Sequence, residues 1–196
     1  MEVDFDRDAR YWLGLYEIEL ARHIRALSEP GAACFDLGSA SGFYALVFAQ
    51  RGADKVLAVE ADPETCARLR RNVASNPELA PRVDVREARI AHDAGAGAVS
   101  IDELAFGSGG FVPDLVKMDV EGNEVAALRG AERLLSERKP HVIVETHSED
   151  FDAGCRWLLE DRGYAVESVE PRRFAPEVRT LGFNRWCVAR GNPPRR

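Results

Sequence analysis

The sequence predicts an α/β fold in which a doubly wound, mostly parallel sheet carries an antiparallel edge strand. Short apolar runs alternate with helical patterns along the 196 residues, and this alternation is typical of right-handed βαβ units around a parallel sheet. The last two runs, 164–169 and 184–190, have no helix-length pattern between them, so we expect them to pair antiparallel at one edge. The length suits one domain with its own core, and we expect a single domain over residues 1–196.

The strands are expected where short apolar runs lie between turn residues. The runs ACFDL (33–37) and KVLAVE (55–60) are largely apolar, as strands buried on both faces of a parallel sheet usually are. Later runs of the same kind complete the prediction. The expected strands are 33–37, 55–60, 82–87, 114–120, 141–146, 164–169 and 184–190.

The helices are expected from apolar periodicity and from residues that begin or end helices. Residues 13–27 place apolar side chains on one face, which predicts an amphipathic helix within an N-terminal helical segment of about residues 5–28. Asp62 as N-cap and Pro63 at the first helical position begin a later helix, and Pro77 halts it. The expected helices are 13–27, 43–52, 63–76, 123–135 and 150–162.

The composition argues against several classes of protein. The formal net charge of −7 disfavours non-specific binding to nucleic acid or to an anionic membrane. No apolar run approaches the length of a membrane span, so none is expected, and the acidic N-terminus lacks the pattern of a signal peptide. Four scattered cysteines without a CxxC pair indicate reduced thiols in a cytoplasmic protein. The tail 191–196 is expected to be frayed.

The carboxyl ends of the central strands are rich in ionisable residues. Ligands of doubly wound sheets bind at this edge, so these residues form the candidate site. The first strand is also followed by a turn of small residues, Gly38-Ser39-Ala40-Ser41-Gly42. The ionisable residues at the strand ends are Asp36, Glu60, Asp119, Glu145 and His147.

This arrangement favours S-adenosylmethionine over a dinucleotide. A turn of small residues lets a ligand touch the backbone, and Glu60 can accept both hydroxyls of a ribose. A pyrophosphate avoids nearby anions, whereas carboxylates stabilise the sulfonium and amino groups of S-adenosylmethionine. The turn also reads G-x-x-x-G rather than G-x-G-x-x-G. Two structural alternatives stay open, in which Asp36 only caps the turn and Glu60 is only a solvated strand end.

Six blocks of sequence match, in order, the motifs of one known family. VKMDVEGNEVAALRGAERLL (116–135) is the strongest match, to an Asp-x-Glu-Gly-x-Glu block, and VSIDEL (99–104) is similar to a strand that contains Asp-Glu-Leu. The other blocks are YWLGLYE (11–17), FDLGSASGFYAL (35–46), VEADP (59–63) and HVIVETHSED (141–150). With these blocks the sequence resembles the FkbM-type S-adenosylmethionine-dependent methyltransferases. The resemblance implies a Rossmann-like, class I methyltransferase fold and an enzyme of the EC 2.1.1 class.

The resemblance also implies roles around the cofactor. The small-residue turn would contact the methionine and ribose parts, Asp36 would orient the turn or meet the amino group, and Glu60 would hold the ribose. Ser39 and Ala40 stand where the family often has Ala and Asn. Ala61, Glu87 and Ala88 would lie near the adenine, and Asp119 would lie where the sulfonium meets the acceptor. The expected cofactor-binding residues are Asp36, Gly38, Ser39, Ala40, Ser41, Gly42, Glu60, Ala61, Glu87, Ala88 and Asp119.

The catalytic candidates are Asp119, Glu145 and His147. Methyl transfer is an in-line displacement, and a base can remove the proton of a hydroxyl acceptor as the new bond forms. His147 has the most suitable ordinary pKa, with a loop histidine facing water as the alternative. Each of the three is also a plausible ligand of a divalent metal, but no closely spaced ligand motif supports such a site, so no metal is predicted.

Other residues near the site have simpler interpretations. Glu124 falls in the first turn of a helix, where a carboxylate is favoured, and Glu121 can cap the same helix. Tyr16 is expected to pack on the apolar face of the N-terminal helix, and Glu17 either reaches the site or is solvated. The arginine-rich segment 170–179 either borders an anionic acceptor or is a solvated loop.

The sequence therefore predicts an S-adenosylmethionine-dependent methyltransferase. The resemblance alone implies that it methylates an oxygen of a small molecule, sugar or lipid-like metabolite. The expected partner is this small-molecule acceptor, with no nucleic acid. An NAD-dependent oxidoreductase and a non-catalytic Rossmann-like nucleotide-binding module stay open as alternatives. The acidic charge and the absence of an Asn-Pro-Pro-aromatic sequence after the fourth strand disfavour an RNA methyltransferase. The acceptor and the oligomeric state are left undetermined.

Overall fold

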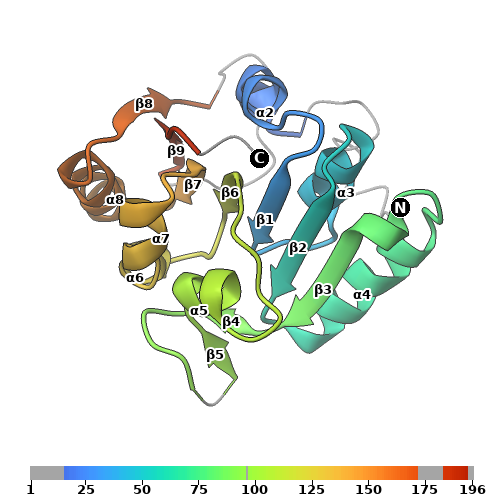
Figure 1. The fold of residues 1–196 in the computed structure, drawn as a ribbon. Coiled ribbons are helices and arrows are strands. Elements are labelled where there is room, and N and C mark those ends of the chain that lie inside the picture. The colour runs from blue at the N-terminus through green and yellow to red at the C-terminus, as the bar shows by residue number, and fades with distance from the viewer. Residues whose placement is uncertain (1–15, 96, 172–182, 194–196) are drawn as a thin grey trace.

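A seven-stranded sheet forms the centre of the computed structural model, which describes residues 16–95, 97–171 and 183–193 (Figure 1). The order of the strands is β3-β2-β1-β6-β7-β9-β8. Neighbouring strands are parallel except at β9, which is antiparallel to both β7 and β8. The strands are β1 (Ala33–Leu37), β2 (Lys55–Glu60), β3 (Val83–Glu87), β6 (Leu115–Met118), β7 (His141–Thr146), β8 (Ala165–Val169) and β9 (Arg185–Arg190). The predicted fold class is confirmed, and so is the antiparallel pair at the edge.

Helices cover both faces of the sheet, as a doubly wound fold requires (Figure 1). On one face α2, α3 and α4 pack through residues such as Ile24, Phe48 and Leu69, and on the other α5 to α8 pack through residues such as Leu104 and Leu158. The helices are η1 (Ile18–Leu20, 3-10), α2 (Ala21–Leu27), α3 (Phe43–Gln50), α4 (Pro63–Ala74), η2 (Ala80–Arg82, 3-10), α5 (Ile101–Phe106), α6 (Glu124–Arg129), α7 (Glu132–Glu137) and α8 (Glu149–Asp161). Among the described residues, no helix combines the length and apolar character that a membrane crossing requires.

The N-terminal helix differs from the prediction of one helix over 13–27. Tyr16 and Glu17 lie in a turn, and Glu17 has a left-handed backbone with φ of 42°. The 3-10 helix η1 and then α2 follow, and Leu20, Ile24 and Leu27 are buried as expected. A left-handed residue cannot continue a right-handed helix, so the chain turns at Glu17. The rest of the expected helical segment, 5–15, lies outside the described residues, as do most of 170–179 and the end of the tail.

The helix expected over 123–135 is divided into α6 and α7 near Gly130. A Cβ atom on Gly130 would lie 2.5 Å from the carbonyl oxygen of Ala91, so another segment packs directly against the break. The Asp102 carboxylate accepts hydrogen bonds from the backbone N–H groups of Arg133 (2.9 Å) and Leu134 (2.8 Å). These contacts start α7 as a separate helix, because they satisfy N–H groups that a continuous helix would use internally.

The likeness of residues 99–104 to a family motif implied a strand, but within this segment only Val99 belongs to a strand. Two short strands, β4 (Arg89–Ile90) and β5 (Ala98–Val99), pair in parallel, and the chain then enters α5. The Ser100 side chain accepts a hydrogen bond from the Glu103 backbone N–H at 3.1 Å. Ser and Glu at this spacing are a capping box, a helix-start signal that is present in the sequence itself.

The backbone of Gly38 packs directly against the loop after β6. Gly38 has φ of 75°, and a Cβ atom built on it would lie 1.7 Å from the carbonyl oxygen of Asp119. Its N–H donates to the Val59 carbonyl at 2.9 Å, and the Asp119 N–H donates to the Leu37 carbonyl at 2.8 Å. Three strand ends therefore meet at one residue that has no room for a side chain.

We expect Gly38→Ala to lower the free energy of unfolding by at least about 2 kcal/mol, because it combines a left-handed backbone with a backbone clash. Gly109→Ala is the matched control, since Gly109 also has φ of 75° but nothing lies within 4 Å of its Cβ position. Urea unfolding followed by circular dichroism measures both changes. Equal losses in the two variants would show that the contact with Asp119 is unimportant.

Candidate active site

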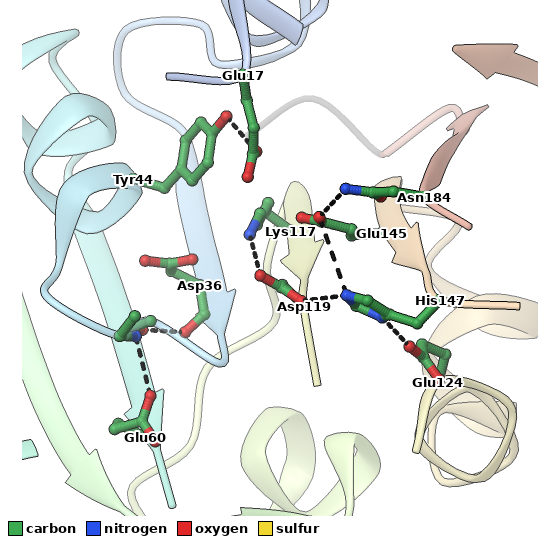
Figure 2. Close-up of polar contacts among 12 residues, drawn as sticks. Glu17, Asp36, Tyr44, Glu60, Lys117, Asp119, Glu124, Glu145, His147 and Asn184 are labelled. Carbon is green, nitrogen blue, oxygen red and sulfur yellow. Dashed lines mark hydrogen bonds and ion pairs between the residues drawn. The ribbon is translucent and has the colours of Figure 1, made fainter. Parts of the chain in front are cut away.

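Most of the predicted site residues gather at the carboxyl ends of β1, β2, β6 and β7 (Figure 2). The turn after β1 is tight, because the N–H groups of Gly38 and Ser39 both donate to the Val59 carbonyl and the Gly42 N–H donates to the Ser39 carbonyl. Ser39 is buried and Ala40 is exposed, with a left-handed backbone. The turn therefore presents its backbone at Ala40 to the outside and leads directly into α3.

Asp36 is a buried carboxylate in an otherwise apolar strand. Its side chain is 1% exposed, and its Oδ2 accepts a hydrogen bond from the Ala45 backbone N–H at 3.0 Å, in the first turn of α3. Burial raises the pKa of Asp36 to about 6, although the nearby Lys117 ammonium opposes the rise. Asp36 therefore fixes the start of α3 behind the turn, which agrees with the proposed capping role. It also contributes negative charge beneath the turn.

Glu60 joins the turn after β1 to the turn after β2. Its Oε2 accepts from the Ala40 backbone N–H at 2.9 Å, and its Oε1 accepts from the N–H groups of Ala61 (2.8 Å) and Asp62 (2.9 Å). Each carboxylate oxygen has two lone pairs, so Oε2 can accept a further hydrogen bond. Glu60 is thus more than a solvated strand end, because its carboxylate organises both turns.

The residues expected near the adenine divide into two kinds. Ala88 is partly buried, and its N–H donates to the Glu60 carbonyl at 3.0 Å, which places the two side by side. The exposed Glu87 side chain instead lies 3.4 Å from Arg70 on α4. Ala61 is exposed next to Glu60. Ala61 and Ala88 therefore border Glu60, while the Glu87 carboxylate pairs with α4.

The three catalytic candidates lie within one cluster across β6 and β7 (Figure 2). The distance from His147 Nε2 is 3.5 Å to Asp119 Oδ1 and 3.9 Å to Glu145 Oε1. One ligand atom from each of the three lies within 4.8 Å of the others. Residues 119 and 147 are far apart in sequence, so the parallel pairing of β6 and β7 brings them together.

Glu145 is the most buried of the three. Its carboxylate accepts a hydrogen bond from the Asn184 side-chain amide at 2.8 Å. Burial, followed by the nearby carboxylates of Glu17 and Asp119, raises the pKa of Glu145 to about 8. The side chain is therefore largely protonated at neutral pH.

Glu124 and His147 form a close pair that the sequence did not predict. Glu124 is fully buried, and its Oε1 accepts hydrogen bonds from His147 Nδ1 at 2.5 Å and from the Gly122 backbone N–H at 3.1 Å. The bond to Glu124 raises the pKa of His147, with burial opposing the rise. Burial alone would raise the pKa of Glu124, but the bond from His147 and the backbone bonds hold it below its ordinary value. His147 is thus held inside the site, and Glu124 is more than a helix-start carboxylate.

Lys117 is a second site residue that sequence reasoning missed. It is 2% exposed, and its Nζ lies 3.8 Å from Asp119 Oδ2 and 4.8 Å from the centre of the Tyr44 ring. Burial lowers the pKa of Lys117, but the surrounding carboxylates outweigh burial and raise it above the ordinary value. A lysine inside the apolar run of β6 was the signal that could have identified it. The carboxylates that act on Lys117 are Asp119, Glu17, Asp36 and Glu145.

Glu17 reaches the site, which settles the alternative left open by the sequence. Its side chain is 5% exposed and its Oε2 accepts a hydrogen bond from the Tyr44 hydroxyl at 2.7 Å. Glu121 does not provide the side-chain cap expected for α6, since the N-cap position there is Asn123 and no side-chain cap bond forms. The helix-start role proposed for Glu121 is therefore wrong.

A cavity of about 630 Å³ lies away from these acids. It is lined at the opposite edge of the sheet by Ala32 and Asp114 before β1 and β6, by His141 at the start of β7, and by Gly191 after the antiparallel β9. A smaller cavity of about 190 Å³ borders Tyr16, Glu17 and Tyr44 at the edge of the candidate site. We place the site by its ionisable residues and its turn rather than by the larger cavity, because open α/β sheets bind ligands at the carboxyl ends of their strands.

Comparison with known proteins identifies a family domain and a shared fold. Residues 88–166 match the Methyltransferase FkbM domain, and no curated protein matches the chain. The solved methyltransferase FkbM from Methylobacillus flagellatus KT is 20% identical, with a TM-score of 0.66 over 81% of this chain and 43% of that one. This chain thus spans less than half the length of that protein.

Two further solved structures have the same architecture. A SAM-dependent O-methyltransferase from Thermotoga maritima is 16% identical, with a TM-score of 0.63 over 92% of this chain and 66% of that one. Aeropyrum pernix fibrillarin, solved with natively bound S-adenosyl-L-methionine, is 17% identical, with a TM-score of 0.58 over 83% of this chain and 68% of that one. The chain therefore has the class I methyltransferase fold, and its resemblance to the FkbM methyltransferases is confirmed by the domain match over residues 88–166.

Proposed function

We propose that the protein transfers a methyl group from S-adenosylmethionine to an oxygen of a small molecule, sugar or lipid-like metabolite. The observation that carries the proposal is the set of carboxylates gathered at the carboxyl ends of β1, β2, β6 and β7 around a tight backbone turn. The domain match and the shared fold support it. The preference for an oxygen acceptor rests on the resemblance to the FkbM family.

The cofactor is proposed to lie across the turn 38–42. Glu60 lies beside the exposed backbone of Ala40, where a ribose could bridge the two turns, and Ala61 and Ala88 border the same point. Asp36 and Asp119 lie on the β1 and β6 side of the turn, where they would stabilise the amino and sulfonium groups. A dinucleotide would instead place its pyrophosphate among these acids, so the oxidoreductase alternative is disfavoured.

The acceptor is proposed to approach from the side of Asp119, Glu145 and His147. Methyl transfer needs the acceptor oxygen close to the methyl carbon and in line with the bond that breaks. The cluster also supplies groups that can take up the acceptor proton as the new bond forms. Buried carboxylates and a buried lysine are expensive in a protein that only binds a nucleotide, so their concentration here favours catalysis over a binding module.

We expect S-adenosylhomocysteine to bind the protein in calorimetry and NAD not to bind. Glu60→Ala should weaken the binding by roughly 1–3 kcal/mol, because the ribose hydroxyls would lose their acceptor. Glu78→Ala changes an exposed glutamate before β3 and is the matched control. Unchanged affinity in Glu60→Ala would remove Glu60 from the site.

The affinity for S-adenosylhomocysteine should fall as the pH decreases from 7.5 to 5. The pKa of Asp36 is about 6, so its carboxylate is mostly ionised at the higher pH and mostly protonated at the lower one. Losing this charge near the ligand amino group should weaken binding by up to about tenfold. Asp36→Asn should remove most of the pH dependence. Calorimetry at the two pH values, with folding checked by circular dichroism, tests both expectations.

Asp119→Asn should lower the rate of methyl transfer by about 100-fold or more, through loss of the carboxylate beside the acceptor. Incorporation of labelled methyl groups into cell-extract fractions identifies the acceptor, and the purified acceptor then gives kcat for the wild type and the variant. Affinity for S-adenosylhomocysteine should change much less than kcat. Full activity of the variant would clear Asp119 of a catalytic role.

A further inference from the structure

We propose that Asp119, Glu145 and His147 form a binding site for a divalent transition-metal ion. The Nε2 atom of His147 lies 3.5 Å from Asp119 Oδ1 and 3.9 Å from Glu145 Oε1. Bonds of about 2.0–2.2 Å to one metal place neighbouring ligand atoms roughly 3.0–3.6 Å apart. The two separations from the nitrogen are longer than hydrogen bonds and close to this range, and one ligand atom from each residue lies within 4.8 Å of the others, so a contraction of the cluster would complete the site.

The orientation of His147 is suited to a metal ligand. Its Nδ1 donates to the fully buried Glu124 carboxylate, which leaves Nε2 directed at Asp119 and Glu145 (Figure 2). Metal-binding histidines commonly donate their other ring nitrogen to a carboxylate in this way, because the bond fixes the ring and its tautomer. Glu124 is therefore assigned the role of the outer partner that positions His147.

The two oxygens of Asp119 have different surroundings. Oδ2 lies 3.8 Å from the Lys117 ammonium, while Oδ1 faces His147 and has no hydrogen-bond partner among the described residues. Lys117 thus neutralises one side of the carboxylate and leaves the other side directed into the proposed site.

Glu17 supplies an independent observation of excess negative charge. It is 5% exposed, and its Oε1 has no hydrogen-bond partner within the described part of the chain. Figure 2 shows its carboxylate directed toward Lys117 and Glu145. Buried carboxylates are costly unless positive charge compensates them, and Lys117 supplies one charge for several acids. A divalent cation would compensate the ionised carboxylates, and Glu145 would lose its proton on binding it.

The ligand set indicates the kind of metal. One imidazole nitrogen with two carboxylates suits Mn²⁺, Fe²⁺ or Zn²⁺ better than Ca²⁺, which prefers oxygen ligands alone. Asp119 and His147 are 19% and 26% exposed, so further ligands can enter from solvent. If the proposed methyl transfer is correct, such an ion would hold the acceptor oxygen and favour loss of its proton. Asp119, Glu145 and His147 would then act together as ligands.

Titration of the chelator-treated full chain with Mn²⁺, followed by the electron paramagnetic resonance signal of free Mn²⁺, tests the site. The wild type should bind one equivalent. His147→Ala and Asp119→Asn should each weaken binding at least tenfold, and Glu124→Gln should weaken it by about 10- to 100-fold. His92→Ala is the matched control, because His92 is exposed and pairs with Asp93 outside the cluster. Its affinity should equal that of the wild type.

Two results would overturn the proposal: absence of saturable Mn²⁺ binding by the wild type, or unchanged affinity in both His147→Ala and Asp119→Asn. Circular dichroism tests whether each variant is folded. If one of the two ligand variants does not fold, the other still tests the site. A parallel titration with S-adenosylhomocysteine separates this proposal from the proposed function. If the wild type binds S-adenosylhomocysteine but not Mn²⁺, only the metal site is contradicted. If it binds Mn²⁺ but not S-adenosylhomocysteine, only the cofactor assignment is contradicted.

Discussion

The electrostatic balance around Lys117 is the constraint on which the site depends. One buried ammonium on β6 faces carboxylates from β1, the loop after β6, β7 and the turn before η1. Its positive charge offsets the electrostatic repulsion among these carboxylates. The consequence is visible in the neighbouring groups. Glu145 keeps its proton near neutrality, while Asp119 lies beside the ammonium. The site therefore combines protonated and charged acids within a few ångströms, as catalytic sites commonly do.

The sheet and the acids at its strand ends could be predicted from the sequence for a simple physical reason. Central strands of a doubly wound sheet are buried on both faces, so they read as apolar runs, and the sites of such sheets lie where those runs end. Asp36, Glu60 and Asp119 were found in this way. The break at Gly130 was not, because it depends on a contact with Ala91 from a distant segment.

The polar pairs of the site could not be predicted because they join residues from different elements. Glu124 lies at the start of α6, His147 lies after β7, and only the folded chain places them 2.5 Å apart. The same holds for Tyr44 on α3 and Glu17 before η1. Periodicity and strand-end rules describe single elements, so they identify which residues can react but not which ones touch. Lys117 is different, since a lysine within an apolar strand is visible in the sequence alone.

The contact between Gly38 and the Asp119 carbonyl has a consequence for how this protein can diversify. Since no side-chain atom fits between them, the turn after β1 and the loop after β6 are joined by one close-packed backbone contact. A homologue that uses a larger substrate therefore cannot enlarge its pocket by moving β6 away from β1 without breaking this contact. Space is more readily obtained near Asn184, whose contact with Glu145 is made by its side chain and not by close-packed backbone.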